Sequence, residues 1–230
     1  MTSKSDETTS PLPYVVPMVA FLMLTAIEGF LPKVEGSLHP VGYPIGYTVK
    51  IVVVVVLCWL CRSAWRDLKP WPRGAALVLA VALGVLVTVL WVGLDGLYPE
   101  FAVLGTRVAF DPTVLPRLGE IAFLIVRMAG LVLVVPLVEE LFWRSFLVRW
   151  VIDPDFARVP IGRVTPLAAA VTSAMFAVAH PEWLPALLTG LAWAGLLWKT
   201  KSVSACLVSH SVANLGLGLY VLSRGAWKFW

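Results

Sequence analysis

Seven apolar stretches follow one another along the chain, and polar or charged residues separate them. A helix that spans a bilayer needs roughly 20 mainly apolar residues, and only helices and closed barrels satisfy every backbone polar group in lipid. The pattern therefore predicts an all-α, polytopic transmembrane bundle of about seven to eight helices. The expected spans are 13–31, 43–61, 75–97, 118–151, 164–180, 183–199 and 202–222.

The polar stretches also predict the domain organisation. Residues 1–12 are largely polar and are expected to form a disordered tail, whereas residues 13–230 are expected to form a single transmembrane domain. The proline-containing stretch 99–117 has the composition of a loop. At a rise of ~1.5 Å per residue, the stretch 118–151 is too long for one upright span.

Composition narrows the class of protein further. Hydrophobic residues make up 59% of the 230 residues and charged residues only 14%. A soluble domain of this length carries more charge, so we expect a multi-pass integral membrane protein in contact with lipid. The net charge of +4 is small and gives no support to nucleic-acid binding. Lys and Arg concentrate after the second, fourth and sixth stretches, which predicts a cytoplasmic N-terminus.

Three charges lie inside the fourth stretch, where the sequence reads VPLVEELFWRSFLVRW. A charge in hydrocarbon is costly and usually faces a partner or a wet cavity. Glu140 and Arg144 are four residues apart, which favours an ion pair on one helix face. Glu139 points about 100° away from Glu140, so one arginine does not neutralise both. We expect Glu139 to exchange protons with water as a catalytic base, although a purely structural role for the charges remains open.

Two further stretches carry polar residues at helical spacing. His180 follows Phe176 by one turn and ends an apolar run, where it either caps the helix or belongs to a site. His210 and Asn214 are four residues apart and lie on one helix face. They either form hydrogen bonds between helices or donate together to a developing oxyanion. Span lengths predict that Glu139 and these polar residues meet at a similar depth in the membrane.

Several other catalytic patterns are missing from the sequence. There is no HExxH zinc motif, no GxSxG nucleophile elbow and no phosphate-binding loop of the Walker type. Asp95 has no second intramembrane aspartate with which to form a dyad. Glu28 and Lys50 are expected to pair between the first two spans.

The three polar motifs occur in a known order. EELFWR at 139–144, FAVAH at 176–180 and HSVAN at 210–214 each lie in a separate apolar stretch. In this order they resemble the CAAX-protease and bacteriocin-processing (CPBP) family of intramembrane endopeptidases. HPEWLPALLTG, GAWKFW, Glu28 and Lys50 further resemble small bacterial CAAX-protease-related proteins found beside exosortase sorting systems, which implies a bacterial cytoplasmic membrane.

The resemblance implies a mechanism within the segment 118–222. Glu139, helped by His180, would activate a water molecule that attacks a peptide carbonyl, and His210 with Asn214 would hold the oxyanion. The ion pair of Glu140 and Arg144 would fix the site, with Phe176 in support. Family members are described both as glutamate proteases and as metalloproteases. No obligatory cofactor is expected, but Zn²⁺ or another divalent ion remains open, with Glu139, His180 and His210 as candidate ligands.

The leading functional hypothesis is therefore an endopeptidase that cleaves a membrane-associated peptide or protein. One alternative is a non-enzymatic peptide-binding or immunity protein that uses the same polar cavity. Another is a proton or ion transporter, because carboxylates and histidines in membranes also form proton relays. A transporter is expected to have discontinuous helices and an internal repeat, and neither is evident in the sequence.

Overall fold

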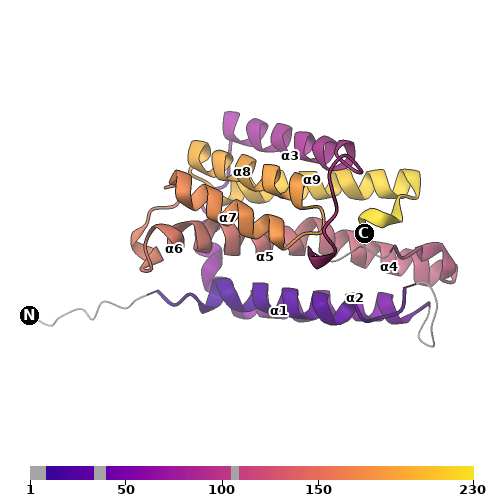
Figure 1. Cartoon of the computed structure of the whole chain (residues 1–230). Helices are drawn as coiled ribbons and strands as arrows, with labels where there is room; N and C mark the ends of the chain where they lie inside the picture. The colour runs from indigo at the N-terminus through magenta and orange to yellow at the C-terminus, as the bar shows by residue number, and fades with distance from the viewer. Residues whose placement is uncertain (1–8, 34–39, 105–108) are drawn as a thin grey trace, which may run out of the picture.

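The computed structural model describes residues 9–33, 40–104 and 109–230. Over these ranges every regular element is a helix, which confirms the all-α prediction (Figure 1). The main helices are α1 (Leu12–Glu28), α2 (Gly42–Leu60), α3 (Ala75–Gly93), α4 (Arg117–Ala129), α5 (Val135–Glu140), α6 (Val148–Ile152), α7 (Pro166–Val178), α8 (Trp183–Thr200) and α9 (Val203–Arg224). Residues 1–8 of the expected tail lie outside the described ranges, and the single-domain organisation stays a prediction.

Helices α4, α5 and α6 form one continuous helix from Arg117 to Ile152. Two π-helical segments, η4 (Gly130–Val134) and η5 (Leu141–Leu147), separate its α-helical parts. The remaining short elements are the 3-10 turns η1 (Arg62–Leu68), η2 (Ala102–Leu104), η3 (Pro112–Val114), η6 (Phe156–Arg158) and η7 (Trp227–Phe229).

The long helix lies between two groups of helices (Figure 1). Helices α1 and α2 run side by side along one edge of the bundle, and α7, α8, α9 and α3 lie beyond the long helix on the other side. Small residues allow the close approach of helices that membrane bundles favour. A Cβ on Gly190 of α8 would lie 2.9 Å from Cα of Ser173 in α7. The site described below lies where the long helix meets α7, α8 and α9.

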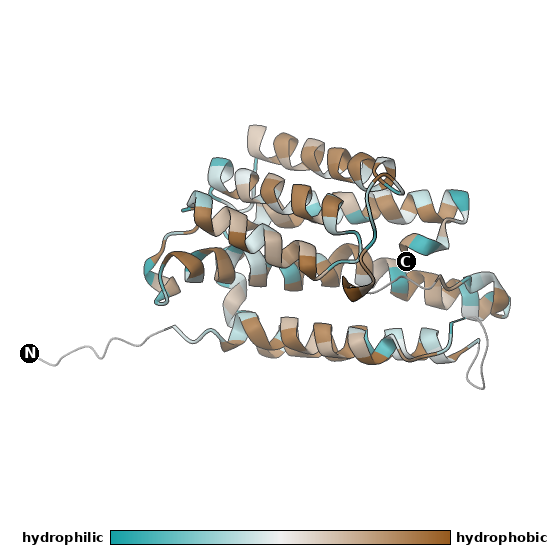
Figure 2. Ribbon diagram, viewed as in Figure 1, coloured by the Kyte–Doolittle hydropathy of each residue, from teal (hydrophilic) through white to brown (hydrophobic). Residues whose placement is uncertain are grey.

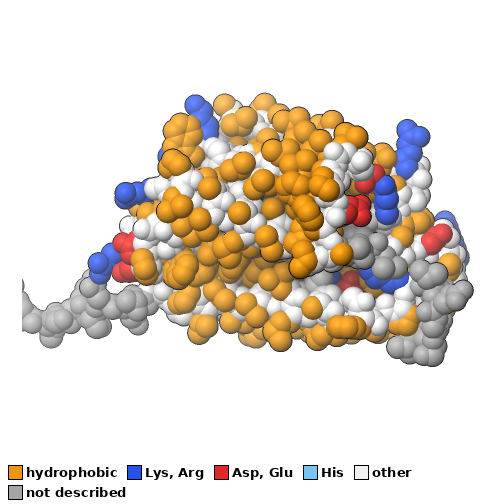
Figure 3. All heavy atoms as spheres, in the orientation of Figure 1, with side chains coloured by type: hydrophobic (Ala, Val, Ile, Leu, Met, Phe, Trp, Pro, Cys, Tyr) orange, Lys and Arg blue, Asp and Glu red, His pale blue; other side chains and the backbone are white. Residues whose placement is uncertain are grey.

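The outer surface of the bundle is apolar. Hydrophobic residues follow the helices and polar residues gather near their ends (Figure 2). On the visible face, hydrophobic side chains cover the middle, and most charged side chains lie toward the two ends (Figure 3). This distribution is that of a bundle crossing a bilayer with its ends in water. The chain is thus an integral membrane protein.

Four helices are long and apolar enough to cross a membrane: Gly42–Leu60, Ala75–Gly93, Arg117–Ile152 and Val203–Arg224. Helices Leu12–Glu28 and Pro166–Val178 are apolar but shorter. Helix α8, which occupies the expected sixth span, is not among these six, because its three tryptophans, two threonines and Lys199 reduce its hydropathy. The predicted orientation in the membrane stays a prediction.

Two buried ion pairs join α1 to α2 and η1 to the long helix. Lys50 of α2 contacts the carboxylate of Glu28 at the end of α1, which confirms the expected pair between the first two spans. Asp67 at the end of η1 pairs with Arg149 of α6 at 2.6 Å. Both pairs are nearly excluded from solvent, so each charge depends on its partner.

Candidate active site

The two adjacent glutamates lie on a short α-helical part between two π-helical segments. Glu139 and Glu140 end α5, which η4 precedes and η5 follows. The sequence predicted one long helical segment over 118–151, and the structure shows that two π-helical segments interrupt its α-helical parts. Pro136 offers no N–H to the carbonyl of Val132, and its ring would press on that carbonyl in a regular α-helix. A wider π turn relieves this conflict, and such segments are frequent at functional sites.

Glu140 is the central acceptor of the site. Its side chain is completely buried. One carboxylate oxygen, Oε1, lies 2.9 Å from Nδ1 of His210, and the other, Oε2, lies 3.4 Å from Nε of Arg144. The expected pair of Glu140 and Arg144 is therefore present. In addition, Glu140 joins the first motif to the third across 70 positions of sequence.

Trp193 of α8 contacts both partners of Glu140. Its ring centroid lies 4.2 Å from that of His210, and the guanidinium carbon of Arg144 lies 5.0 Å from the same ring. Its indole N–H donates to the hydroxyl of Ser209 at 3.0 Å, which fixes the ring. Sequence reasoning did not identify Trp193, because α8 carries none of the three motifs and its tryptophans were assigned no role in the site.

Phe176 of α7 connects the second motif to this group. Its ring lies 4.8 Å from the guanidinium carbon of Arg144, 6.0 Å from the ring of Trp193 and 4.4 Å from the ring of His180. Phe176 is almost fully buried. It therefore forms a wall shared by the arginine of the first motif and the histidine of the second.

His180 lies just beyond the last residue of α7. Its Nδ1 lies 2.7 Å from the carbonyl oxygen of Phe176, and the edge of Trp91 from α3 lies 5.9 Å away between ring centroids. Because a carbonyl only accepts, Nδ1 donates, and a neutral imidazole then has its acceptor nitrogen at Nε2. The helix cap that the sequence suggested is formed, and it also sets the tautomer of the ring.

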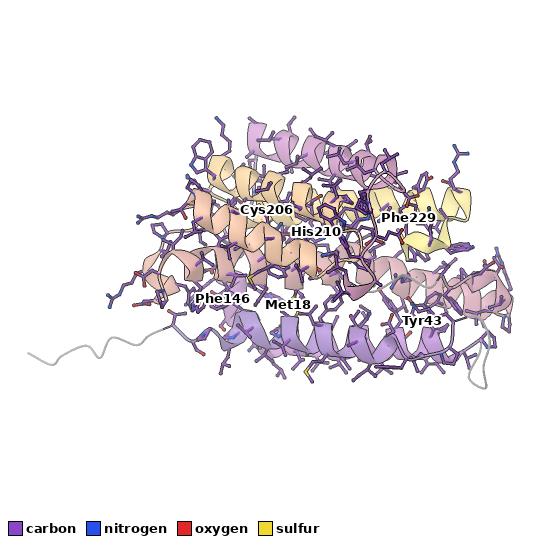
Figure 4. All side chains as sticks on the ribbon, in the orientation of Figure 1. Met18, Tyr43, Phe146, Cys206, His210 and Phe229 are labelled. Carbon is purple, nitrogen blue, oxygen red and sulfur yellow. The ribbon has the colours of Figure 1, made fainter. Side chains whose placement is uncertain are left out.

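The contacts connect the three motifs in one series. Glu140 binds His210, His210 stacks on Trp193, Trp193 touches Phe176, and Phe176 carries His180. Glu139, which is only 4% exposed, is the chain neighbour of Glu140. Figure 4 marks His210 on α9 in the middle of the bundle.

Asn214 forms a hydrogen bond between helices, which is one of the two roles that the sequence suggested. Its side-chain amide donates to the carbonyl oxygen of Leu131 at 2.8 Å. Leu131 belongs to η4, so Asn214 joins α9 to the π segment that precedes the glutamates. An amide nitrogen carries two hydrogens, and this hydrogen bond uses one of them.

The candidate metal ligands do not form a cluster. Within the described ranges, no three side chains of His, Cys, Asp or Glu gather as they would to hold a metal ion, and this includes Glu139, His180 and His210. The Nδ1 atoms of both histidines already contact acceptors, the carboxylate of Glu140 and the carbonyl of Phe176. The arrangement therefore does not fit a three-ligand metal site.

Buried carboxylates, two histidines and an arginine thus lie inside a membrane-embedded helical bundle. Such a set can activate water and stabilise a developing negative charge, as a membrane-embedded hydrolase requires.

Comparison with known proteins identifies this class more closely. Residues 121–216 match the family model described as type II CAAX prenyl endopeptidase Rce1-like. The matched region runs from α4 into α9 and contains all three motifs. No curated protein and no solved structure matches the chain. This match confirms the resemblance to CAAX-type intramembrane proteases that the motifs suggested. The narrower resemblance to exosortase-linked proteins stays a prediction.

Proposed function

We propose that this protein is an intramembrane endopeptidase that hydrolyses a peptide bond in a membrane-associated peptide or protein with Glu139 as its catalytic base. The match of residues 121–216 to the endopeptidase family model supports a protease activity, and the assignment of roles to residues is the proposal. One observation carries it: the 2.9 Å contact of Glu140 with His210, which joins two motifs beside Glu139 in a buried environment.

The first step is the activation of water. The carboxylate of Glu139 accepts a proton from a water molecule, whose oxygen attacks the carbonyl carbon of the scissile bond. His180 contributes Nε2, which accepts a hydrogen bond from the same water and orients it. When the tetrahedral intermediate collapses, the protonated Glu139 gives its proton to the leaving amine, so that the base is restored.

The second requirement is a donor to the oxyanion. A carboxylate oxygen only accepts, so Nδ1 of His210 carries a proton toward Glu140. The proposed role requires that His210 also carry a proton at Nε2, so that this N–H donates to the oxyanion of the intermediate. The second amide hydrogen of Asn214 is the other proposed donor. Removing one such donor typically costs about 10²–10³-fold in rate.

Glu140 and Arg144 have a supporting role in this proposal. Their ion pair is buried against Phe176 and Trp193, so it holds His210 in a fixed orientation before substrate binds. Preorganised charges in a water-excluded site stabilise a transition state more strongly than mobile ones.

The proposed chemistry is of the glutamate type and involves no metal. The proposal predicts that the purified protein cleaves substrate at the same rate before and after treatment with a chelator. A loss of activity with chelator that Zn²⁺ restores would contradict it.

The test is a cleavage assay on the purified protein in detergent. Internally quenched peptides are supplied with and without an attached lipid, including a farnesylated CAAX peptide, because the family description names prenyl endopeptidases. Replacing Glu139 by Gln or Ala is expected to lower kcat by about 10²–10⁴-fold, the usual contribution of a general base. Glu120→Gln is the matched control, since Glu120 lies in the same long helix and pairs with Arg117 near its start.

The outcomes separate the alternatives. Full activity in the Glu139→Ala protein would disprove the proposed mechanism. A peptide that binds tightly to the unsubstituted protein and is never cleaved would favour the capture protein. Proton movement in vesicles that Glu139→Gln abolishes, without any cleavage, would favour a transporter.

A further inference from the structure

A second buried ion pair contacts the same π-helical segment as the site. Asp67, at the end of η1, accepts three hydrogen bonds on Oδ2: from the hydroxyl of Tyr14 at 2.8 Å, from the hydroxyl of Ser145 at 2.6 Å and from Nη2 of Arg149 at 2.6 Å. Arg66 adds a looser contact to Oδ1 at 3.7 Å. The carboxylate is thus satisfied by groups from α1 and from the long helix.

Arg149 extends this network into the backbone of the long helix. Its Nε donates to the carbonyl oxygen of Ser145, and its Nη2 lies 3.0 Å from the hydroxyl of the same residue. The guanidinium carbon lies 5.1 Å from the ring of Phe156. Both Asp67 and Arg149 are less than a tenth exposed, which makes the pair costly to break.

The network contacts the residue directly after Arg144. Ser145 lies inside η5, the π-helical segment Leu141–Leu147 that begins immediately after Glu140. Such segments are rare and are usually single turns, so we take this seven-residue one to depend on contacts from outside the helix. Asp67 supplies such a contact to the side chain of Ser145, and Arg149, in the next part of the same long helix, donates to the carbonyl of Ser145.

We propose that Asp67 is a positioning residue for the active site, which acts through Ser145 and Arg149 to hold η5 so that Arg144 faces Glu140. This inference rests on the proposed function, because it assigns Asp67 to the reaction through the site that contains Glu139. The hydrogen bonds and ion pairs of Asp67 described above go to Tyr14, Ser145, Arg149 and Arg66. None of these four residues has a proposed catalytic role.

The other buried ion pair provides a matched control. Glu28 and Lys50 are as deeply buried as Asp67 and Arg149, and their ion pair joins α1 to α2. Glu28 lies 14 residues beyond Tyr14 along α1, a rise of about 21 Å. Its replacement removes a buried carboxylate without touching η5.

A spectroscopic test does not depend on the substrate. The chain contains three histidines, so selective ¹⁵N labelling of histidine rings gives few signals in detergent. We expect Asp67→Asn and Ser145→Ala to shift or broaden the Nδ1 signal of His210, because Glu140 loses its fixed relation to Arg144. Glu28→Gln is expected to leave that signal in place. An unchanged His210 signal in folded Asp67→Asn and Ser145→Ala proteins would overturn the proposal, whether or not cleavage has been found.

Kinetics supply the second test on any peptide that is cleaved. Asp67→Asn is expected to lower kcat by about 10- to 100-fold with little change in KM, since small displacements at an active site have effects of this size. In an Arg144→Ala background the same substitution should have almost no further effect, because Asp67 acts through Arg144. Ser145→Ala keeps the Asp67–Arg149 ion pair and is the variant to use where Asp67→Asn fails to fold.

The double-variant kinetics distinguish a positioning role of Asp67 from a purely structural one. Equal fold-losses for Asp67→Asn with and without Arg144 would show that Asp67 contributes only to general stability and would overturn the proposal. Glu28→Gln should give equal losses in both backgrounds, which fixes the behaviour of a merely structural carboxylate. Absence of cleavage in every protein would contradict the proposed function, while the His210 signal would still decide the positioning role.

Discussion

Removing the carboxylate of Glu140 tests the central contact of the site. Glu140 has no exposed surface and contacts Arg144 at 3.4 Å and His210 at 2.9 Å. In the Glu140→Ala protein the guanidinium of Arg144 stays between the rings of Phe176 and Trp193 without its counter-charge. Breaking a buried pair in this way costs about 3–5 kcal/mol. A typical domain is stabilised by only about 5–15 kcal/mol, so the loss should be large.

Two companion variants separate charge from packing. Glu140→Gln keeps the volume and an oxygen that accepts from His210, so its cost should be smaller, about 1–3 kcal/mol for the lost charged hydrogen bond. The double variant Glu140→Ala with Arg144→Ala removes the uncompensated charge. It should therefore cost less than the sum of the two single variants, which is the signature of a coupled pair.

The assay is unfolding in mixed micelles as the fraction of denaturing detergent is raised, followed by circular dichroism. The free energy of unfolding is compared for the unsubstituted protein, the two single alanine variants, the double variant and Glu140→Gln. An unfolding midpoint for Glu140→Ala equal to that of the unsubstituted protein would refute the buried pair. Additive costs in the double variant would refute the direct coupling of Glu140 with Arg144.

Two further predictions concern packing and orientation. Gly84→Ala should destabilise the protein by about 1–3 kcal/mol, because a Cβ on Gly84 would lie 2.5 Å from the carbonyl oxygen of Ser209. Gly93→Ala is the control and should be neutral in the same unfolding assay, because a Cβ on Gly93 meets nothing within 4 Å. Trp193→Phe should lower kcat more than it raises KM, because His210 loses a ring anchored by its hydrogen bond to Ser209. Unchanged kcat in that variant would count against the orienting role of Trp193.

The helices of this bundle could be predicted because each one follows from the hydropathy of its own stretch of sequence. An apolar stretch in lipid must satisfy its own backbone hydrogen bonds, so hydropathy alone indicates a helix. The expected start of the long helix at residue 118 differs by one from the observed Arg117. The pairs Glu140–Arg144 and Glu28–Lys50 could also be predicted, since an isolated charge in a membrane requires a partner.

The departures from regular helix could not be predicted in the same way. The sequence around Pro136 is compatible with a kink or a break as well as with a wider turn. Groups from elements far away in sequence contact both π segments, Asn214 of α9 at η4 and Asp67 of η1 at η5. The amide of Asn214 donates to the carbonyl oxygen of Leu131, 83 positions earlier, and so ties α9 to η4.

The sequence by itself determined that the chain forms membrane helices, because hydropathy is a property of each stretch alone. It also determined three polar motifs in the order that a protease family shows, each in its own apolar stretch. What only the tertiary structure decided is which groups meet. Trp193 lies against His210 and Arg144, and Asp67 reaches Ser145, through the packing of helices far apart in sequence. The physical reason is that helix formation in lipid depends on local composition, whereas side-chain contact depends on how close small residues allow the helices to approach and on how each is rotated.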